Sequence, residues 1–179
     1  GRPRPVVVEI PCDILDGSGD VEVPAPATTA PREPPRQQIE DAAARLNRAQ
    51  RPVIWAGGGL ITSGGSEPLR QLAEHLGAPV FTTVLGKGAL AEDHPLAAGS
   101  CTIHPAARDY LSGCDAMLAV GTRFTEEETV GFQMRLPEIL IHVDIDPAEF
   151  NKNVKVDSAI SGDVGSVVRG WTARVADVD

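Results

Sequence analysis

The sequence is poor in aromatic residues and in positive charge, and it has no long apolar run. Phe, Trp and Tyr make up 4% of the 179 residues, so a surface of rings for stacking nucleic-acid bases is not expected. Acidic residues outnumber Lys and Arg by 25 to 16, and the formal charge of −9 argues against nucleic acid as a partner. No run approaches the roughly 18 apolar residues of a membrane span, and no signal peptide opens the sequence, so no membrane partner is predicted.

Cysteine is also scarce. Cys12, Cys101 and Cys114 form no C-x-x-C pair, which excludes a disulfide framework and a four-cysteine zinc site. We expect three small buried or half-buried side chains, and the pattern predicts a reducing, cytoplasmic location.

Prolines divide the chain into two parts. The apolar segment 6–10 is typical of a strand, but it is isolated by prolines and follows the first residues directly, so we expect a piece of a longer protein. Six prolines between Pro11 and Pro35 predict a linker without a helix or a central strand. The predicted boundary therefore separates residues 1–35 from a domain at 36–179.

The second part is organised around a short apolar run that stops at three glycines. Residues 53–56 are typical of a buried strand, Gly57, Gly58 and Gly59 follow, and a helical pattern begins at about Ser66. A strand, a glycine turn and a helix N-terminus form a natural seat for a phosphate, because free N–H groups and the helix dipole point toward it.

Strands and amphipathic helices alternate along this part. Helices are predicted at 36–50, 66–76, 105–111 and 164–175, and strands at 53–56, 79–83, 116–120, 139–143 and 154–160. Residues 84–101 are predicted to form a long functional loop with a brief strand at 96–99. The alternation indicates an α/β fold in three layers, a Rossmann-like parallel sheet with helices on both faces.

Ligands of such sheets bind beyond the carboxyl ends of the strands. The residues there are glycines, hydroxyls, one arginine and carboxylates, which suit a ligand with phosphate and ribose groups: Gly57, Gly58, Gly59, Thr82, Thr83, Gly121, Thr122, Arg123, Asp144, Ile145, Asp146, Gly162 and Asp163. A plain NAD dehydrogenase is disfavoured, because Thr62 stands at the third glycine position and Thr83 where a ribose-binding acid is expected. A tight turn without a ligand also explains the glycines.

Catalytic groups are not evident. His75 is expected to face solvent, His142 to be a satisfied buried histidine and His94 to shape its loop, while His104 is the best candidate for ligand contact. No metal spacing links the histidines, and no nucleophile elbow, Walker loop or pair of carboxylates is present. The pattern is typical of a binding or scaffolding domain without an active site of its own.

Four stretches in order, 51–59, 87–96, 120–124 and 141–149, resemble the central domain of thiamine-diphosphate-dependent enzymes, most of all the acetolactate synthase (acetohydroxyacid synthase) large-subunit family. Residues 1–11 are similar to the last strand of that family's preceding pyrimidine-binding domain. The resemblance implies a six-stranded parallel sheet between two thiamine-binding domains.

The resemblance also implies chemistry for the full-length protein. Such enzymes use thiamine diphosphate and Mg²⁺ to decarboxylate a 2-oxo acid and pass the acyl group on; carboligase, decarboxylase and acyltransferase reactions all fit. The catalytic Glu and the metal motif belong to the pyrimidine-binding and diphosphate-binding domains, so this segment alone is expected to be inactive. Those domains are its expected partners, in a homo-oligomer.

The flavin-containing members hold FAD on this domain. The positions that match their contacts are Gly57, Gly58, Gly59, Thr82, Thr83, His104, Gly121, Thr122, Arg123, Asp144, Ile145 and Asp163. The chain departs from them after Phe124, where Thr125-Glu126-Glu127 replaces Asp-Asp-Arg. Other members hold ADP or no nucleotide, so FAD, ADP and a purely structural domain stay open. An NAD-consuming deacylase on the same sheet would need a zinc module, for which three scattered cysteines do not suffice.

Overall fold

The computed structural model describes residues 3–27, 30 and 32–175, and the chain divides into two units, Gly1–Ala30 and Pro31–Asp179. Arg32 and Pro34 already belong to the second unit: the Arg32 carbonyl accepts a hydrogen bond from the Asp163 amide (2.8 Å), and Pro34 is buried beside Gly162. This division precedes the predicted boundary by about five residues. The assignment of residues 1–35 to a preceding domain and its linker stays a prediction.

Two features of the first unit differ from expectation. A short helix, α1 (Cys12–Leu15), forms where none was predicted, because the stretch between Pro11 and Pro24 is free of proline and has room for one turn. The Leu15 amide donates to the Pro11 carbonyl (3.0 Å). Residues 6–10 are exposed and form no strand. A strand needs a neighbour for its backbone hydrogen bonds, and the described residues of this unit contain no other strand. Gly1 and Arg2, which were grouped with this strand, lie outside the described residues.

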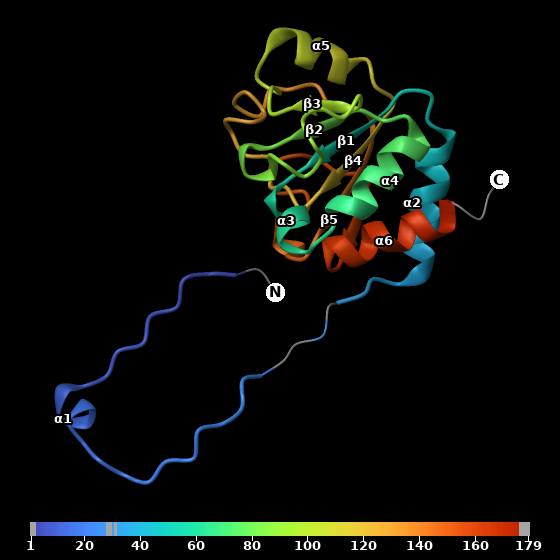
Figure 1. Cartoon of the computed structure of the whole chain (residues 1–179). Helices are drawn as coiled ribbons and strands as arrows, with labels where there is room; N and C mark the ends of the chain where they lie inside the picture. The colour runs from blue at the N-terminus through green and yellow to red at the C-terminus, as the bar shows by residue number, and fades with distance from the viewer. Residues whose placement is uncertain (1–2, 28–29, 31, 176–179) are drawn as a thin grey trace. The chain divides into compact units, whose positions relative to one another are not determined.

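The second unit contains a parallel sheet of six strands, which confirms the predicted fold class. The strands are β1 (Pro52–Ala56), β2 (Val80–Thr82), β3 (Ala97–Gly99), β4 (Ala116–Val120), β5 (Ile139–Asp144) and β6 (Ser158–Ser161). Their order in the sheet is β3-β2-β1-β4-β5-β6 (Figure 1). The chain thus reverses direction across the sheet between β1 and β4, and this switch point is where ligands bind in open sheets.

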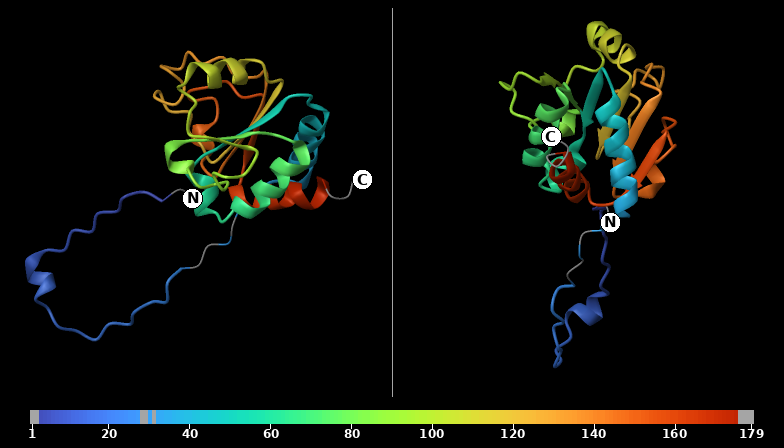
Figure 2. Two further views of the ribbon diagram at one scale, coloured as in Figure 1. Left: turned by 45° about the horizontal axis from the view of Figure 1, so that its top comes forward. Right: turned by 90° about the vertical axis from the view of Figure 1, so that its right-hand side faces the viewer.

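Helices cover both faces of the sheet. α2 (Arg36–Arg48), α4 (Ser66–Leu76) and α6 (Val164–Val175) lie together on one face, and α5 (Pro105–Ser112) lies on the other (Figures 1 and 2). Successive strand residues point to opposite faces, so Ile54 and Leu118 enter the first core while Trp55 and Met117 enter the second. All four of these side chains are fully buried.

Several predicted boundaries shift because side chains capture backbone N–H groups. α2 ends two residues earlier than predicted, since the Asp115 carboxylate accepts from the amides of Gln50 (2.7 Å) and Arg51 (2.9 Å). β6 begins at Ser158 rather than at residue 154, because Asn151 Oδ1 accepts from the Val156 amide (2.9 Å) and keeps that segment in a turn.

Short helices follow several strands. α3 (Gly58–Thr62) begins directly after the turn at Gly57, where only a loop was predicted, because two glycines obscure a helical pattern. η1 (Val84–Gly86) and β3 occupy parts of the predicted loop 84–101, and η2 (Pro147–Glu149) follows β5.

Three loops interlock through glycine backbone at the switch point. A Cβ atom added to Gly57 would lie 2.1 Å from the Gly121 carbonyl oxygen, and one added to Gly86 would lie 2.2 Å from the Ala56 carbonyl oxygen. Gly121 itself has a φ of +61°, which favours glycine. The segments after β1, β2 and β4 are therefore held in direct backbone contact.

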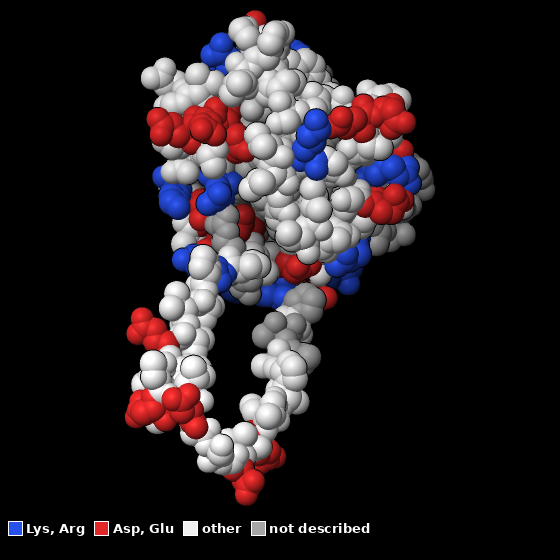
Figure 3. Space-filling view, turned by 60° about the vertical axis from the view of Figure 1, so that its left-hand side comes forward, with Lys and Arg blue, Asp and Glu red and all other residues white. Residues whose placement is uncertain are grey.

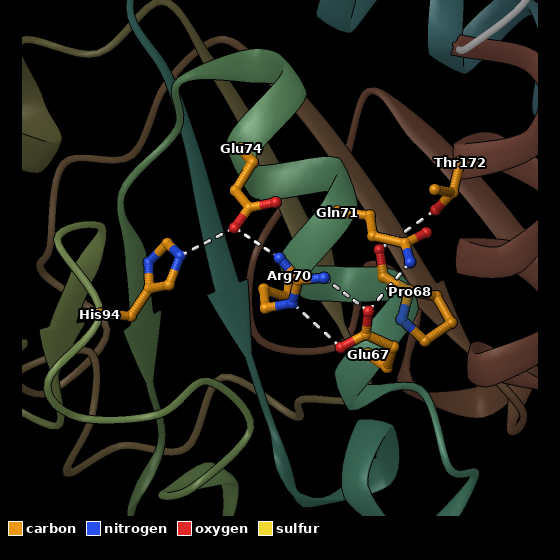
Figure 4. Close-up of polar contacts among 7 residues, drawn as sticks. All are labelled: Glu67, Pro68, Arg70, Gln71, Glu74, His94 and Thr172. Carbon is orange, nitrogen blue, oxygen red and sulfur yellow. Dashed lines mark hydrogen bonds and ion pairs between the residues drawn. The ribbon is translucent and has the colours of Figure 1, made fainter.

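A surface network connects α4 with its neighbours (Figure 4). Arg70 forms ion pairs with Glu67 and Glu74 (2.6 Å each), and Glu74 also contacts Nε2 of His94 (3.1 Å), in the segment before β3. The Thr172 hydroxyl donates to the Pro68 carbonyl (3.1 Å) and connects α6 with the first turn of α4.

We predict that Gly57→Ala destabilises the chain by about 2 kcal/mol or more, because a methyl group cannot fit against the Gly121 carbonyl. Urea unfolding followed by circular dichroism measures the change. Gly58→Ala is the matched control: its added Cβ meets Leu85 atoms no nearer than 3.1 Å, so the loss should be much smaller. Equal stability of Gly57→Ala and the wild type would contradict the packing argument.

A second prediction concerns acid pH. Hydrogen bonds from Arg70, and secondly from Gln71, lower the pKa of Glu67 from 4.5 to about 2. Because this pKa is depressed, the stabilisation is present above the unfolded-state value and is lost as pH falls through about 2. An NMR titration of the Glu67 carboxyl should give that midpoint, and Arg70→Ala should move it upward. Lys87→Ala, which removes a cation elsewhere, should leave it unchanged.

Candidate functional site

The candidate residues other than His104 lie along the carboxyl edge of the sheet, at the ends of five of its strands or in the segments that follow them. The Gly121 amide donates to the Val143 carbonyl (2.9 Å), and the Gly162 amide donates to the Asp144 carbonyl (3.1 Å). The loop after β4 thus contacts the end of β5, which contacts the loop after β6. The side of the molecule that is at the left in Figure 1 carries both basic and acidic side chains (Figure 3).

The loops after β1 and β2 pack against each other. Gly57 is buried, whereas Gly58 and Gly59 are half-exposed at the start of α3. Thr82 and Thr83 are each 5% exposed at the end of β2, and Oγ1 of Thr83 accepts from the Gly86 amide (2.9 Å). The Thr83 hydroxyl therefore caps η1, a local role that the sequence did not indicate.

The turn after β4 carries two backbone amides and one cation that are available to a ligand. Among the described residues, none accepts a hydrogen bond from the amides of Thr122 or Arg123. The Arg123 side chain is exposed and forms no ion pair with a described residue. An acceptor with negative charge would satisfy all three groups, as in backbone anion sites elsewhere.

The carboxylates farther along the edge already shape backbone turns. Oδ1 of Asp144 accepts from the Asp146 amide (2.9 Å), and Oδ1 of Asp163 accepts from the Ser166 amide (2.9 Å), capping α6. Ile145, which directly follows Asp144, is half-buried. Each carboxylate retains further lone pairs, so capping does not exclude an additional hydrogen bond from a ribose hydroxyl.

His104 is the candidate that the structure does not join to the others. Its Nδ1 accepts from the Ala106 amide (3.3 Å) and caps α5, and none of its described hydrogen bonds reaches another candidate. The other expectations for histidine are confirmed for His75, which is exposed, and for His94, whose Nδ1 accepts from the Leu96 amide (3.2 Å) within its loop.

His142 and Asn153 touch the candidate turn, although neither was predicted to belong to the site. Nε2 of His142 lies 2.9 Å from the Thr122 carbonyl, and Nδ2 of Asn153 donates to the Arg123 carbonyl (3.1 Å). Burial lowers the pKa of His142 and so favours the neutral ring. Because the Thr122 carbonyl can only accept, the proton of this neutral ring lies on Nε2. For His142, the only sequence signal of a role at this turn was its position in an apolar strand. For Asn153 the sequence contained no such signal.

Two buried hydroxyl groups at this edge have no hydrogen-bond partner within the described part of the chain. Oγ1 of Thr82 and Oγ of Ser161, at the ends of β2 and β6, find none among the described residues. Buried polar atoms are rarely left without a partner, so these hydroxyls are suited to a polar ligand. Together with the free amides and Arg123, they fit the phosphate and hydroxyl groups of a nucleotide. The glycines do not decide the matter, because packing alone explains them.

Residues 3–27, 30 and 32–175 contain neither a metal-binding cluster nor a membrane-spanning helix. No group of three or more His, Cys, Asp or Glu side chains there could hold a metal ion. No helix in that part of the chain is long and apolar enough to cross a bilayer.

Comparisons with known proteins agree with this fold. The family described as thiamine pyrophosphate enzyme, central domain, matches residues 39–170. A probable acetolactate synthase large subunit of Methanocaldococcus jannaschii is 45% identical over 185 residues, covering 98% of this chain and 31% of that protein. Acetolactate synthase large subunit IlvB1 of Mycobacterium tuberculosis is 38% identical over 175 residues, covering 94% and 28%. The chain thus spans about a third of the length of these relatives.

A solved structure gives the same result. An enzyme from Mycobacterium smegmatis, described as thiamin diphosphate-dependent, superposes with a TM-score of 0.67 and 25% identity, covering 84% of this chain and 30% of the other. The order of the sheet, the match over residues 39–170 and the curated relatives all agree. The chain therefore belongs to the family of thiamine pyrophosphate enzyme central domains, and its resemblance to acetolactate synthase large subunits is confirmed.

Proposed function

We propose that this chain is the non-catalytic central domain of an acetolactate-synthase-like enzyme and that it binds an adenine nucleotide, FAD or ADP. The full-length protein would decarboxylate a 2-oxo acid and transfer or ligate the acyl group. Its pyrimidine-binding and diphosphate-binding domains would bind thiamine diphosphate and Mg²⁺. The full-length protein would be a homo-oligomer in the cytoplasm. The 45% identity with a probable acetolactate synthase large subunit supports this assignment.

The observation that carries the nucleotide proposal is the set of free donors in the turn after β4. The amides of Thr122 and Arg123 and the guanidinium of Arg123 have no acceptor among the described residues. They lie at the switch point of the sheet, beside the glycine turn that begins α3. Donors grouped in this way favour a phosphate, because charge-assisted hydrogen bonds are stronger than neutral ones.

Each part of the edge would hold one part of the nucleotide. Arg123 and the adjacent amides would bind the diphosphate, and Gly58 and Gly59, which are half-exposed, would let it approach the backbone. The Thr82 hydroxyl would gain the partner that it lacks, and Asp144 or Asp163 would accept from ribose. Bound FAD would supply a diphosphate and a flat flavin ring.

A purely structural domain is the alternative, and two observations favour it. Backbone packing accounts for Gly57, Gly59 and Gly121 without a ligand. Glu126 and Glu127 follow the turn closely and are exposed, so they weaken the positive potential around Arg123. In this case the domain joins the catalytic domains and contributes to assembly alone.

We predict that ADP and FAD raise the melting temperature of the chain, whereas NAD raises it less. A ligand at about 100 times its dissociation constant adds about 2.7 kcal/mol to the stability of the folded state. Arg123→Ala should abolish the rise. Arg48→Ala, which removes an equal charge from an exposed position on α2, should preserve it.

Differential scanning fluorimetry at several ligand concentrations measures the effect. An unchanged melting temperature with all three nucleotides would contradict nucleotide binding and favour the structural alternative. A rise that is the same in Arg123→Ala would contradict the assignment of the site to this turn.

A further inference from the structure

The carbonyl oxygens of the turn after β4 are all occupied by donors from outside the turn. Gly121 accepts from the Gly59 amide (3.1 Å), and Thr122 accepts from Nε2 of His142 (2.9 Å). Nδ2 of Asn153 donates to the next two carbonyls, those of Arg123 (3.1 Å) and Phe124 (3.2 Å). Four successive carbonyl dipoles are thus bound to protein, while the amides of Thr122 and Arg123 have no acceptor among the described residues.

This arrangement matters because a carbonyl oxygen repels an anion and an amide N–H attracts one. A turn that was free to rotate could present either end of its peptide groups to a phosphate. Donors that hold the carbonyls on the protein side prevent this rotation, so the amides stay available before any ligand binds. Preorganisation of this kind increases affinity by reducing the ordering cost of binding.

His142 is suited to this role by its surroundings. Its ring is fully buried and lies edge-on between Phe124 (5.3 Å between centroids) and Phe150 (5.1 Å). Because a carbonyl only accepts, the ring must carry its proton on Nε2. Nδ1 is then a buried acceptor without a described partner, so an apolar residue would suit this strand position better if packing were its only task.

Asn153 acts on the other half of the turn. It is half-buried in the loop between η2 and β6, thirty residues beyond Arg123 in sequence. Phe124, whose carbonyl it also holds, has a φ of +50°, an unfavourable value for an aromatic residue. A donor that bridges two carbonyls offsets such strain, and strained residues that are held in this way are common at binding sites.

We infer that His142 and Asn153 are positioning residues, which hold the Gly121–Phe124 turn so that the amides of Thr122 and Arg123 and the Arg123 side chain face a phosphate. This inference rests on the proposed nucleotide-binding function. It adds two residues from separate segments, β5 and the loop before β6, that would set nucleotide affinity without touching the nucleotide.

Two substitutions of His142 form a matched pair. In His142→Gln the side-chain amide reaches the position of Nε2 and can still donate to the Thr122 carbonyl, whereas in His142→Asn it reaches only the position of Nδ1. Asn153→Ala removes the donor to the other two carbonyls and, being half-buried in a loop, should fold without difficulty.

The test measures two quantities on the same purified chain: the dissociation constant of ADP by isothermal titration calorimetry and the amide NMR signals of residues 121–124 without nucleotide. We expect His142→Asn and Asn153→Ala to weaken ADP binding by about 3–10-fold, the range for one lost hydrogen bond. The amide signals of Thr122 and Arg123 should shift or broaden in both. His142→Gln should remain within about twofold of the wild type with its signals in place.

Failure of this inference and failure of the proposed function would give different results. Wild-type ADP affinity in both His142→Asn and Asn153→Ala would overturn the inference, as would an equal loss in His142→Gln and His142→Asn, which would indicate a role in packing alone. If the wild-type chain binds neither ADP nor FAD, the proposed function fails. The amide signals of the turn then still show whether the two side chains hold it in place. Unchanged signals in His142→Asn would mean that His142 does not hold the turn.

Discussion

The close contact between Gly57 and Gly121 is the constraint on which the carboxyl edge of this sheet depends. It joins the loops after β1 and β4, the two strands that flank the switch point, and Gly86 brings the loop after β2 into the same cluster. Because these contacts are between backbone atoms, no side chain can be added at Gly57 without moving a neighbouring loop. The geometry of the edge is therefore set by packing before any ligand is considered.

This constraint changes how the glycine run is interpreted. Three glycines after a buried strand are usually associated with a phosphate, but here Gly57 and Gly59 are needed for contact with Gly121. The groups that point to an anion lie instead in the turn after β4. There, two amides and Arg123 have no acceptor within the described part of the chain, while the carbonyls are engaged by Gly59, His142 and Asn153. The glycines place this turn, and two distant side chains orient it.

Most of the elements could be predicted because their signals are local. Helix α4 and strand β4 have the predicted bounds, since an apolar stripe and a C-terminal Gly77 define the first and a short buried run the second. Elements without a local signal were missed: α3 begins in glycines, and α1 occupies a gap between prolines. The early end of α2 depends on Asp115, which lies 65 residues from Gln50 in sequence.

The sequence by itself determined the class of fold, the family and the set of loops that carry the candidate residues, because these follow from periodicity and from motifs of a few adjacent residues. Only the tertiary structure decided which of those residues meet. The hydrogen bonds it shows for His104 reach only neighbouring residues of its own segment, whereas His142 and Asn153 bond to the turn after β4. The physical reason is that hydrogen bonds between loops depend on the order of the strands and on the path of each loop. Local patterns in the sequence contain no information about either.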